Sequence, residues 1–530
     1  MNRKRTFGTR AALGGLTAAV ALMTAPLAAT ADEVADLKTN QELLQRRVDQ
    51  LAQSGNVGAG PVLAPTAGGP VAVQMTGGSF PRSFLIPGTD TSIRVGGEIR
   101  MMTTFWITGG NPNAQSSTTN AGTTGQLNTI PLTGLTVGSS GWIARERSNN
   151  VLTMSPQQSK LSVETRTPTA WGEARSFIEF DFAGNTADSN DPLATSNNLQ
   201  PRLRYAYGTL GPLLFGQANS NFNDSDAGME SLEFGGLIGG GGPSRIPQIR
   251  WTQPLGGWGL LGALSVSAES PEPTLWAPGA STSGIFGQDP TSAVTLAPAT
   301  GAFAPLGTPA NPLKPGAPDV VAAWYIPQPW GHVDFAAVWR PALVVSTPFG
   351  APLTGGVDKK YMGFGGSFSG DVKPRWFGWD KDFFTWNIVG GQAMGRYLYA
   401  GSTSTLALVS NLTGNTLASN SVLVKPTDGF AGNIAYRHQW TDTIRSNVGV
   451  GIWRLDINGL NGIVCPAASK NTASGGCALN ERLLMAKANV IWQPVAFVDF
   501  GLEYNYGQRK VLSGSAGNEH VLVNRMRLRF

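Results

Sequence analysis

The chain ends in the stretch VLVNRMRLRF (Val521–Phe530), in which arginine alternates with apolar side chains. The alternating residues are Arg525, Met526, Arg527, Leu528, Arg529 and Phe530. Because successive side chains of a β-strand point to opposite faces, this pattern predicts a strand with one cationic and one apolar face. An edge strand of a soluble sheet and a strand of a membrane barrel both fit this stretch, so the rest of the chain has to distinguish them.

The first 31 residues have the pattern of a secretory signal peptide. Basic residues precede the apolar run AALGGLTAAVALMTAPLA, and the sequence ATA at residues 29–31 fits the small-x-small cleavage pattern. A membrane anchor is the alternative, but Gly14, Gly15 and Pro26 interrupt the run and no second such run follows. We therefore expect residues 1–31 to be removed and the mature protein to function beyond the inner membrane.

Residues 32–54 predict a short coiled coil. Residues at spacings of three and four form its a and d positions: Val34, Leu37, Gln41, Leu44, Val48 and Leu51. An amphipathic helix packed on its own domain is the alternative. Fewer than three heptads cannot hold strands together alone, so a coiled coil here implies a larger oligomer that aligns the helices. Residues 55–82, rich in glycine and proline, are expected to be a flexible linker.

Beyond this linker the composition is uniform, which indicates one domain over residues 83–530. Only 14% of the residues are charged, while glycine numbers 68 and aromatic residues make up 9%. Few charges with many turn formers and aromatic rings fit neither a disordered chain nor a helical enzyme.

Two long segments show the same two-faced alternation as the C-terminus. In residues 93–107, one face carries Ile93, Val95 and Ile99, and the other carries Arg94 and Arg100. Residues 498–509 repeat the pattern and form a hairpin with the terminal strand. Both segments are long enough to span a membrane as tilted strands.

Between these segments, short links alternate with long stretches rich in Gly, Ser, Pro and Asn, which is the layout of an outer-membrane barrel of about 16 antiparallel strands. Lipid offers no hydrogen-bond partners, so the sheet must close on itself, with its apolar face outward and its polar face toward the lumen. The C-terminal strand would close the barrel against the strand that contains Ile93. A soluble sandwich is the alternative, but it would bury the apolar face.

Several stretches resemble the DcaP-like trimeric porins of proteobacteria. They are LIPGTDTSIRVGG (Leu85–Gly97), KLSVETRTPT (Lys160–Thr169), FIEFDFAG (Phe177–Gly184), PRLRYAYGTLGPLLFGQANSNF (Pro201–Phe222) and IRWTQPLGG (Ile249–Gly257). The resemblance implies a homotrimer in the outer membrane, an N-terminal coiled coil in the periplasm, and a channel for small anionic solutes such as dicarboxylates. The terminal Phe530 is similar to the insertion signal of porins, which the barrel-assembly machinery recognises.

Side chains alternate between the two faces of a strand, so the position of a residue along its strand, here called its parity, predicts whether it lines such a channel. The predicted lining residues are Arg94, Arg100, Arg166, Arg175, Arg202, Arg204, Arg250, Arg525, Arg527 and Arg529; Arg340, Arg445 and Arg509 share the parity. Carboxylates on the same faces are fewer: Glu98, Glu164, Glu173, Glu179, Asp181, Asp334, Asp499 and Glu503. Together with the net charge of +5, this excess favours anions, since guanidinium matches carboxylate. Neutralised wall pairs are the alternative for any one arginine.

An acidic segment follows the predicted strand that ends near Phe222 and precedes a glycine run. It contains Asp224, Asp226, Glu230 and Glu233. In porins the loop after the fifth strand commonly folds inward and narrows the lumen, so this segment is predicted to be the constriction loop. Opposite a basic wall it would create a transverse field. A solvated surface loop is the alternative.

The remaining features predict a disulfide and no catalysis. Cys465 and Cys477 are the only cysteines, and in an exported chain they are expected to pair within an extracellular loop. The sequence contains no P-loop, no H-E-x-x-H and no G-x-S-x-G motif, so we expect no enzyme, cofactor, metal or nucleic-acid site. A barrel hydrolase and a structural envelope anchor with a plugged barrel are the alternatives. Conductance would distinguish the anchor from a porin.

Overall fold

A computed structural model shows a compact unit that extends from Gly78 to Phe530, separate from residues 1–77. The structure describes residues 77–109, 150–183, 200–233, 235–240, 244–256, 261–271, 274–276, 285–286, 313–348, 356–398, 407–411, 423–465, 467, 477 and 479–530. The predicted signal peptide, coiled coil and most of the linker lie outside these residues. The first residues of the compact unit, 78–82, belong to the predicted linker.

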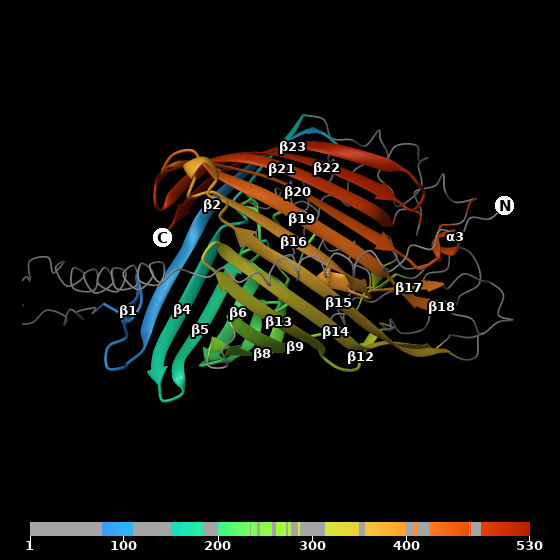
Figure 1. Ribbon diagram of the computed structural model, residues 1–530, viewed down its shortest axis with the longest axis horizontal. Helices are drawn as coiled ribbons and strands as arrows, with labels where there is room; N and C mark the ends of the chain where they lie inside the picture. The colour runs from blue at the N-terminus through green and yellow to red at the C-terminus, as the bar shows by residue number, and fades with distance from the viewer. Residues whose placement is uncertain are drawn as a thin grey trace, which may run out of the picture. The chain divides into compact units, whose positions relative to one another are not determined.

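The described part of the chain is almost entirely β-structure (Figure 1). Its first strands are β1 (Phe84–Leu85), β2 (Ser92–Thr108), β3 (Val151–Ser155), β4 (Lys160–Thr169), β5 (Gly172–Asp181), β6 (Arg202–Leu210), β7 (Leu213–Asn219), β8 (Arg245–Pro254), β9 (Ala263–Glu269), β10 (Leu275–Trp276), β11 (Ile285–Phe286) and β12 (Leu313–Pro315). The later strands are β13 (Asp319–Gln328), β14 (Gly331–Pro348), β15 (Gly356–Val372), β16 (Phe383–Gln392), β17 (Leu408–Asn411), β18 (Leu423–Pro426), β19 (Asp428–Gln439), β20 (Ile444–Asp456), β21 (Asn480–Val495), β22 (Val498–Val511) and β23 (Ala516–Arg529). The helical turns described are η5 (Trp376–Gly378), η6 (Gly395–Tyr397) and α3 (Asn461–Val464).

These strands form a closed antiparallel barrel of sixteen strands, counted over the described residues. The wall closes where β23 pairs with β2, with Met526 opposite Met101. The backbone N–H of Phe530 also donates to the carbonyl of Gly97, at 3.1 Å. β3 and β4 pair with successive parts of β2 and together make one wall strand. The predictions of an all-β barrel, of about sixteen strands and of closure by the C-terminal strand are therefore confirmed.

The connections differ at the two ends of the barrel. Several at one end are short, at residues 170–171, 211–212, 329–330, 440–443 and 496–497. Connections at the opposite end are mostly longer, and β10, β11, β17 and β18 form a small separate sheet within two of them. In outer-membrane barrels the short turns are periplasmic. Among the described residues, no helix has the length and apolar character needed to cross a membrane.

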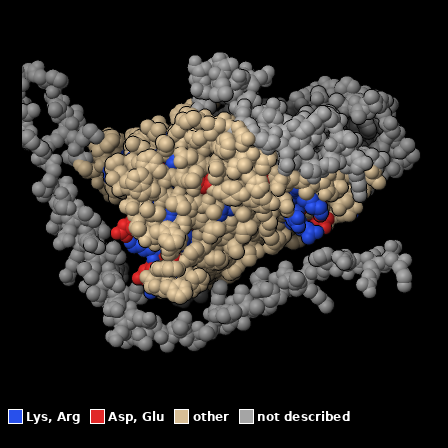
Figure 2. All heavy atoms as spheres, turned by 90° about the horizontal axis from the view of Figure 1, so that it is seen from above, with Lys and Arg blue, Asp and Glu red and all other residues tan. Residues whose placement is uncertain are grey.

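The outer surface of the barrel is apolar. On β2, Ile99 is 61% exposed while its neighbour Arg100 is buried inside, and on β23 Met526 is 51% exposed while Arg525 is buried. On the face shown in Figure 2, Lys, Arg, Asp and Glu side chains are sparse over the described surface. The alternation in the sequence thus separates lipid-facing from inward-facing side chains, as the parity of a strand requires.

A hydrophobic core lies inside the barrel. Its inward-facing wall residues come from β8, β13, β14, β16, β19, β20 and β21, and include Val321, Val338, Val389 and Trp453. Connecting segments supply the rest of this core, among them Phe222, Ile238, Met394, Tyr397, Leu398 and Leu460. The expectation that inward faces are polar is therefore wrong for these strands, because connecting segments fold in and cover them with apolar side chains.

Candidate channel site

The arginines predicted to line a channel lie on one continuous arc of the barrel wall. The strands of this arc pair in the order β8, β7, β6, β5, β4, β2 and β23. Inward orientation follows from alternation: Arg250 lies between Ile249 and Trp251, which are 61% and 52% exposed. Arg204 is buried beside the exposed Leu203 in the same way. The arc positions Arg94, Arg100, Arg166, Arg175, Arg202, Arg204, Arg250, Arg525, Arg527 and Arg529 on neighbouring strands.

Asp499 of β22 is shared by the three arginines of the C-terminal strand. The distances from a guanidinium nitrogen to a carboxylate oxygen of Asp499 are 2.9 Å for Arg525, 2.5 Å for Arg527 and 2.6 Å for Arg529. Glu98 of β2 lies next to this group, 3.6 Å from Arg527. One carboxylate between three guanidinium groups leaves a local excess of positive charge.

Glu164 of β4 is the centre of a second group of the same kind. Arg166 and Arg175 bind its carboxylate at 2.8 and 2.7 Å, and Arg94 forms a further ion pair with it. Glu164 is almost fully buried, whereas the three arginine side chains are each about 30% exposed. Arg166 also lies 3.4 Å from Glu173, so three guanidinium groups face two carboxylates and the group keeps an excess of positive charge inside the barrel.

Aromatic rings support the Glu164 group. The guanidinium carbon of Arg166 lies 4.5 Å from the ring centre of Phe80, and that of Arg175 lies 5.5 Å from the rings of both Phe177 and Tyr207. Such cation–π contacts hold the flat guanidinium groups in fixed orientations. Phe80 precedes the first strand, and nothing in its sequence surroundings predicted this role.

The other predicted arginines differ in their pairing. Arg202 and Arg204 both bind Asp181, at 2.6 and 2.8 Å, and Arg204 also binds Glu179 at 2.7 Å. For Arg250 the described residues include no ion-pair partner. The alternative of neutralised wall pairs thus describes single contacts correctly, but the shared carboxylates leave the arc cationic as a whole.

The segment between β7 and β8, here called the inner loop (the described residues 220–233 and 235–240), lies inside the barrel against β19–β23. The backbone N–H of Leu232 donates to Glu503 at 3.0 Å, and its carbonyl accepts from Arg525 at 3.2 Å. Ile238 packs against β20, where its carbonyl would lie 2.0 Å from a Cβ added at Gly451. β7 is the fifth wall strand, so this is the segment for which the sequence predicted an inward fold.

The predicted acidic residues of the inner loop bind the wall on which the loop lies. Glu230 pairs with Arg445 at 2.6 Å, Glu233 with the buried Lys487 at 2.5 Å, and Asp224 with His332 at 2.8 Å. Asp226 is exposed, and the described residues include no ion-pair partner for it. These contacts show how the loop is held against the wall on which it lies.

Two of these carboxyl groups have shifted pKa values of opposite sign. Burial alone would raise the pKa of Glu230, but the hydrogen bonds and charge of Arg445 outweigh burial and hold it below its ordinary value. Burial raises the pKa of Glu233, although Lys487 opposes this shift. A pKa below the ordinary value keeps the carboxylate of Glu230 charged, and its pair with Arg445 ionic, into mildly acidic solution.

Glycines on the inward faces of the wall strands were a signal that sequence reasoning missed. A Cβ at Gly501 would lie 2.4 Å from a methyl carbon of Leu232, and one at Gly449 would lie 2.5 Å from Leu237. Glycine within a strand often marks a close approach of another segment. Gly449 and Gly501 could therefore have indicated where the inner loop contacts the wall.

Cys465 and Cys477 form a disulfide in the connection between β20 and β21. Both cysteines are buried, and the carbonyl of Cys477 accepts from the N–H of Ser513, at 3.2 Å. The disulfide therefore lies beside the β22–β23 connection, at the end of the barrel opposite the short turns. Among the described residues, no group of three or more His, Cys, Asp or Glu side chains could hold a metal ion.

A closed barrel with an apolar outer surface and charged groups inside defines a channel of the outer-membrane porin class. The chain belongs to the porin subfamily, whose family model matches residues 82–520. Its membership indicates a channel in the outer membrane rather than an enzyme. A comparison with curated proteins returned no match.

The fold is similar to those of solved outer-membrane proteins. The outer membrane channel DcaP of Acinetobacter baumannii superposes with a TM-score of 0.58 at 20% identity, covering 86% of this chain and 100% of that chain. The resemblance to DcaP-like porins is thus confirmed in the fold. The trimer form of OmpT of Vibrio cholerae gives a TM-score of 0.41 at 10% identity, covering 83% of this chain and 99% of that chain. The anion-selective porin of Comamonas acidovorans gives a TM-score of 0.41 at 6% identity, covering 83% of this chain and 100% of that chain.

Proposed function

We propose that this porin carries small hydrophilic anions, dicarboxylates in particular, by passive diffusion along the arginine arc. The observation that carries the proposal is the sharing of single carboxylates by three arginines, at Asp499 and again at Glu164. An anion beside such a group replaces missing negative charge, and the planar guanidinium donates two parallel hydrogen bonds to a carboxylate.

Assembly completes the proposal. We infer a homotrimer whose N-terminal helices, residues 32–54, meet in the periplasm as a coiled coil. The heptad spacing of the sequence and the resemblance of several stretches to DcaP-like trimeric porins support this assembly. We further propose that the exposed Phe530 at the end of β23 is the group recognised by the barrel-assembly machinery.

Planar-bilayer recording of the purified protein tests this function. In a gradient of potassium chloride, the sign of the reversal potential gives the ratio of anion to cation permeability, and we expect chloride to exceed potassium. Dicarboxylates such as succinate should reduce the chloride current by competing for the arginine arc. A cation-selective current would contradict the proposal.

The apolar core inside the barrel favours a second function, that of an envelope anchor with a plugged barrel. The same experiment separates the two functions. Correctly folded protein that inserts but never conducts would support the anchor.

A further inference from the structure

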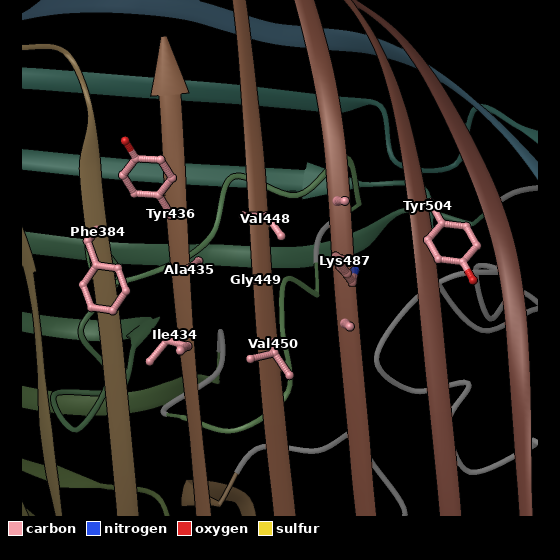
Figure 3. A pocket seen from close by; sticks show the side chains of 11 residues that line it. Phe384, Ile434, Ala435, Tyr436, Val448, Gly449, Val450, Lys487 and Tyr504 are labelled. Atoms are coloured by element: carbon pink, nitrogen blue, oxygen red, sulfur yellow. The ribbon is translucent and has the colours of Figure 1, made fainter. Parts of the chain in front are cut away.

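A groove of about 420 Å³ lies on the outer face of the barrel across β16 and β19–β22 (Figure 3). Its outward-facing lining is apolar and includes Ile434, Val448 and Val450, which are 47%, 54% and 36% exposed. The small residues Ala486 and Ala488 of β21 lie between larger side chains on the neighbouring strands, so they form its floor. The groove is therefore a concave apolar surface on the side of the barrel that faces lipid.

The groove is continuous with a turn at the short-turn end of the barrel. Tyr436 lines the groove and stacks on Trp376 of the β15–β16 turn, with ring centres 6.2 Å apart. The Tyr436 hydroxyl donates to Asp382 at 2.5 Å, and His438 contacts the same carboxylate at 2.7 Å. These contacts hold the turn against the outer surface beside the groove.

The turn itself presents aromatic rings and charged side chains outward. Phe377 is 88% exposed, and both Phe377 and Arg375 have left-handed backbone angles, with φ of 54° and 49°. Such angles are unfavourable for residues other than glycine and cluster at sites with a function. The exposed Arg375 and Lys381 lie in the same turn as the exposed Asp380, and Lys381 forms a solvent-exposed ion pair with Asp442 at 2.5 Å. Aromatic rings and charged groups therefore occur together there.

We propose that this surface binds an anionic phospholipid, with an acyl chain in the groove and its phosphate at Arg375 and Lys381. An acyl chain matches the apolar groove, and a phosphate matches the cations at the end of the barrel where periplasmic-leaflet headgroups lie. Tryptophan and tyrosine prefer this headgroup region of a membrane, which accounts for the exposed rings of the turn. The proposal concerns the lipid around the channel and is independent of which solute passes through it.

Native mass spectrometry of the detergent-purified assembly, titrated with dioleoyl phosphatidylglycerol, tests the site. We expect one tightly held lipid per chain in the wild type and about tenfold weaker retention in Ala488→Trp, since the larger ring fills the groove. Ala337→Trp is the matched control, because Ala337 is an exposed outward-facing alanine on β14, outside the groove. It should retain lipid as the wild type does.

A second variant tests the headgroup site independently of the groove. In Arg375→Gln with Lys381→Gln, the preference for phosphatidylglycerol over dioleoyl phosphatidylcholine should disappear.

Equal retention by Ala488→Trp and wild type would overturn the proposal. So would dissociation of the oligomer in Ala488→Trp alone, because the groove would then be a contact between copies of the chain. If Ala488→Trp does not fold, unchanged lipid preference in the double variant overturns the proposal.

Discussion

Leu232 of the inner loop packs against Gly501 of β22 so closely that a Cβ at position 501 would lie 2.4 Å from Cδ2 of Leu232. Leu232 is completely buried and belongs to a small core with Met102, Trp106 and Val523. The inner loop is thus held by close packing as well as by ion pairs. Any inward side chain at position 501 has to displace it.

Gly501→Ala is therefore expected to move the inner loop away from β22 and change the single-channel conductance. The added methyl group should also destabilise the barrel by about 1–3 kcal/mol, as overpacking does in other cores. Gly366→Ala on β15 is the control, since the nearest atom to its new Cβ would be the Ala336 carbonyl oxygen at 3.6 Å, an ordinary contact. Equal conductance of the two variants would show that the inner loop does not shape the ion path.

Replacing Arg525, Arg527 and Arg529 with glutamine should shift permeability toward cations. The three arginines share Asp499, whose negative charge remains when they are removed. The reversal potential in a gradient at low salt measures the shift, and high salt should reduce it because exposed charges are screened over about 10 Å at 0.1 M. Arg482→Gln, on the outward face of β21, is the control. An unchanged selectivity in folded protein would place the ion path away from these arginines.

The Glu230–Arg445 ion pair predicts an acid-sensitive contribution to stability. The pKa of Glu230 in the folded protein is below its ordinary value of 4.5. The stabilising contribution of the pair is therefore complete above about pH 4.5 and is lost as the pH falls through the folded-state pKa. Glu230→Gln should lower the free energy of unfolding by about 1 kcal/mol at neutral pH. The difference from wild type should vanish in stronger acid. Thermal unfolding measured against pH would contradict this prediction if the difference were constant.

Opening the Cys465–Cys477 disulfide should affect stability far more than conductance. The pair closes a short loop beside the β22–β23 connection, and such a link stabilises by about 2–3 kcal/mol. Mass spectrometry of unreduced peptides should show the pair linked. The Cys465→Ser, Cys477→Ser variant should unfold at a lower temperature with conductance close to wild type. A large change in conductance would indicate that this connection reaches the ion path.

Removing residues 32–53 should weaken the trimer while leaving conducting barrels. The predicted coiled coil is too short to hold three chains alone, so contacts between barrels must supply most of the association. Native mass measurement at decreasing concentration compares the full chain with the shortened one. Monomers in both cases would contradict the coiled-coil hypothesis.

The sequence by itself determined the barrel and its inward and outward faces. The alternation of Arg525, Met526 and Arg527 specifies a two-faced strand wherever it lies, because parity is a local property of extended backbone. Closure against β2 followed, since a sheet in lipid cannot leave an edge unpaired. The arginines of the channel arc were identified by the same parity.

Only the tertiary structure decided what covers each inward face. Parity shows that Val338 and Trp453 point inward but not that the connecting segments meet them there with apolar side chains. Ion-pair partners are equally remote in sequence: Glu230 and Arg445 are 215 residues apart. Such contacts depend on where a long connection folds after the barrel closes, and no local periodicity encodes that path. The division of the interior between an apolar core and an arginine arc is thus a property of the folded chain.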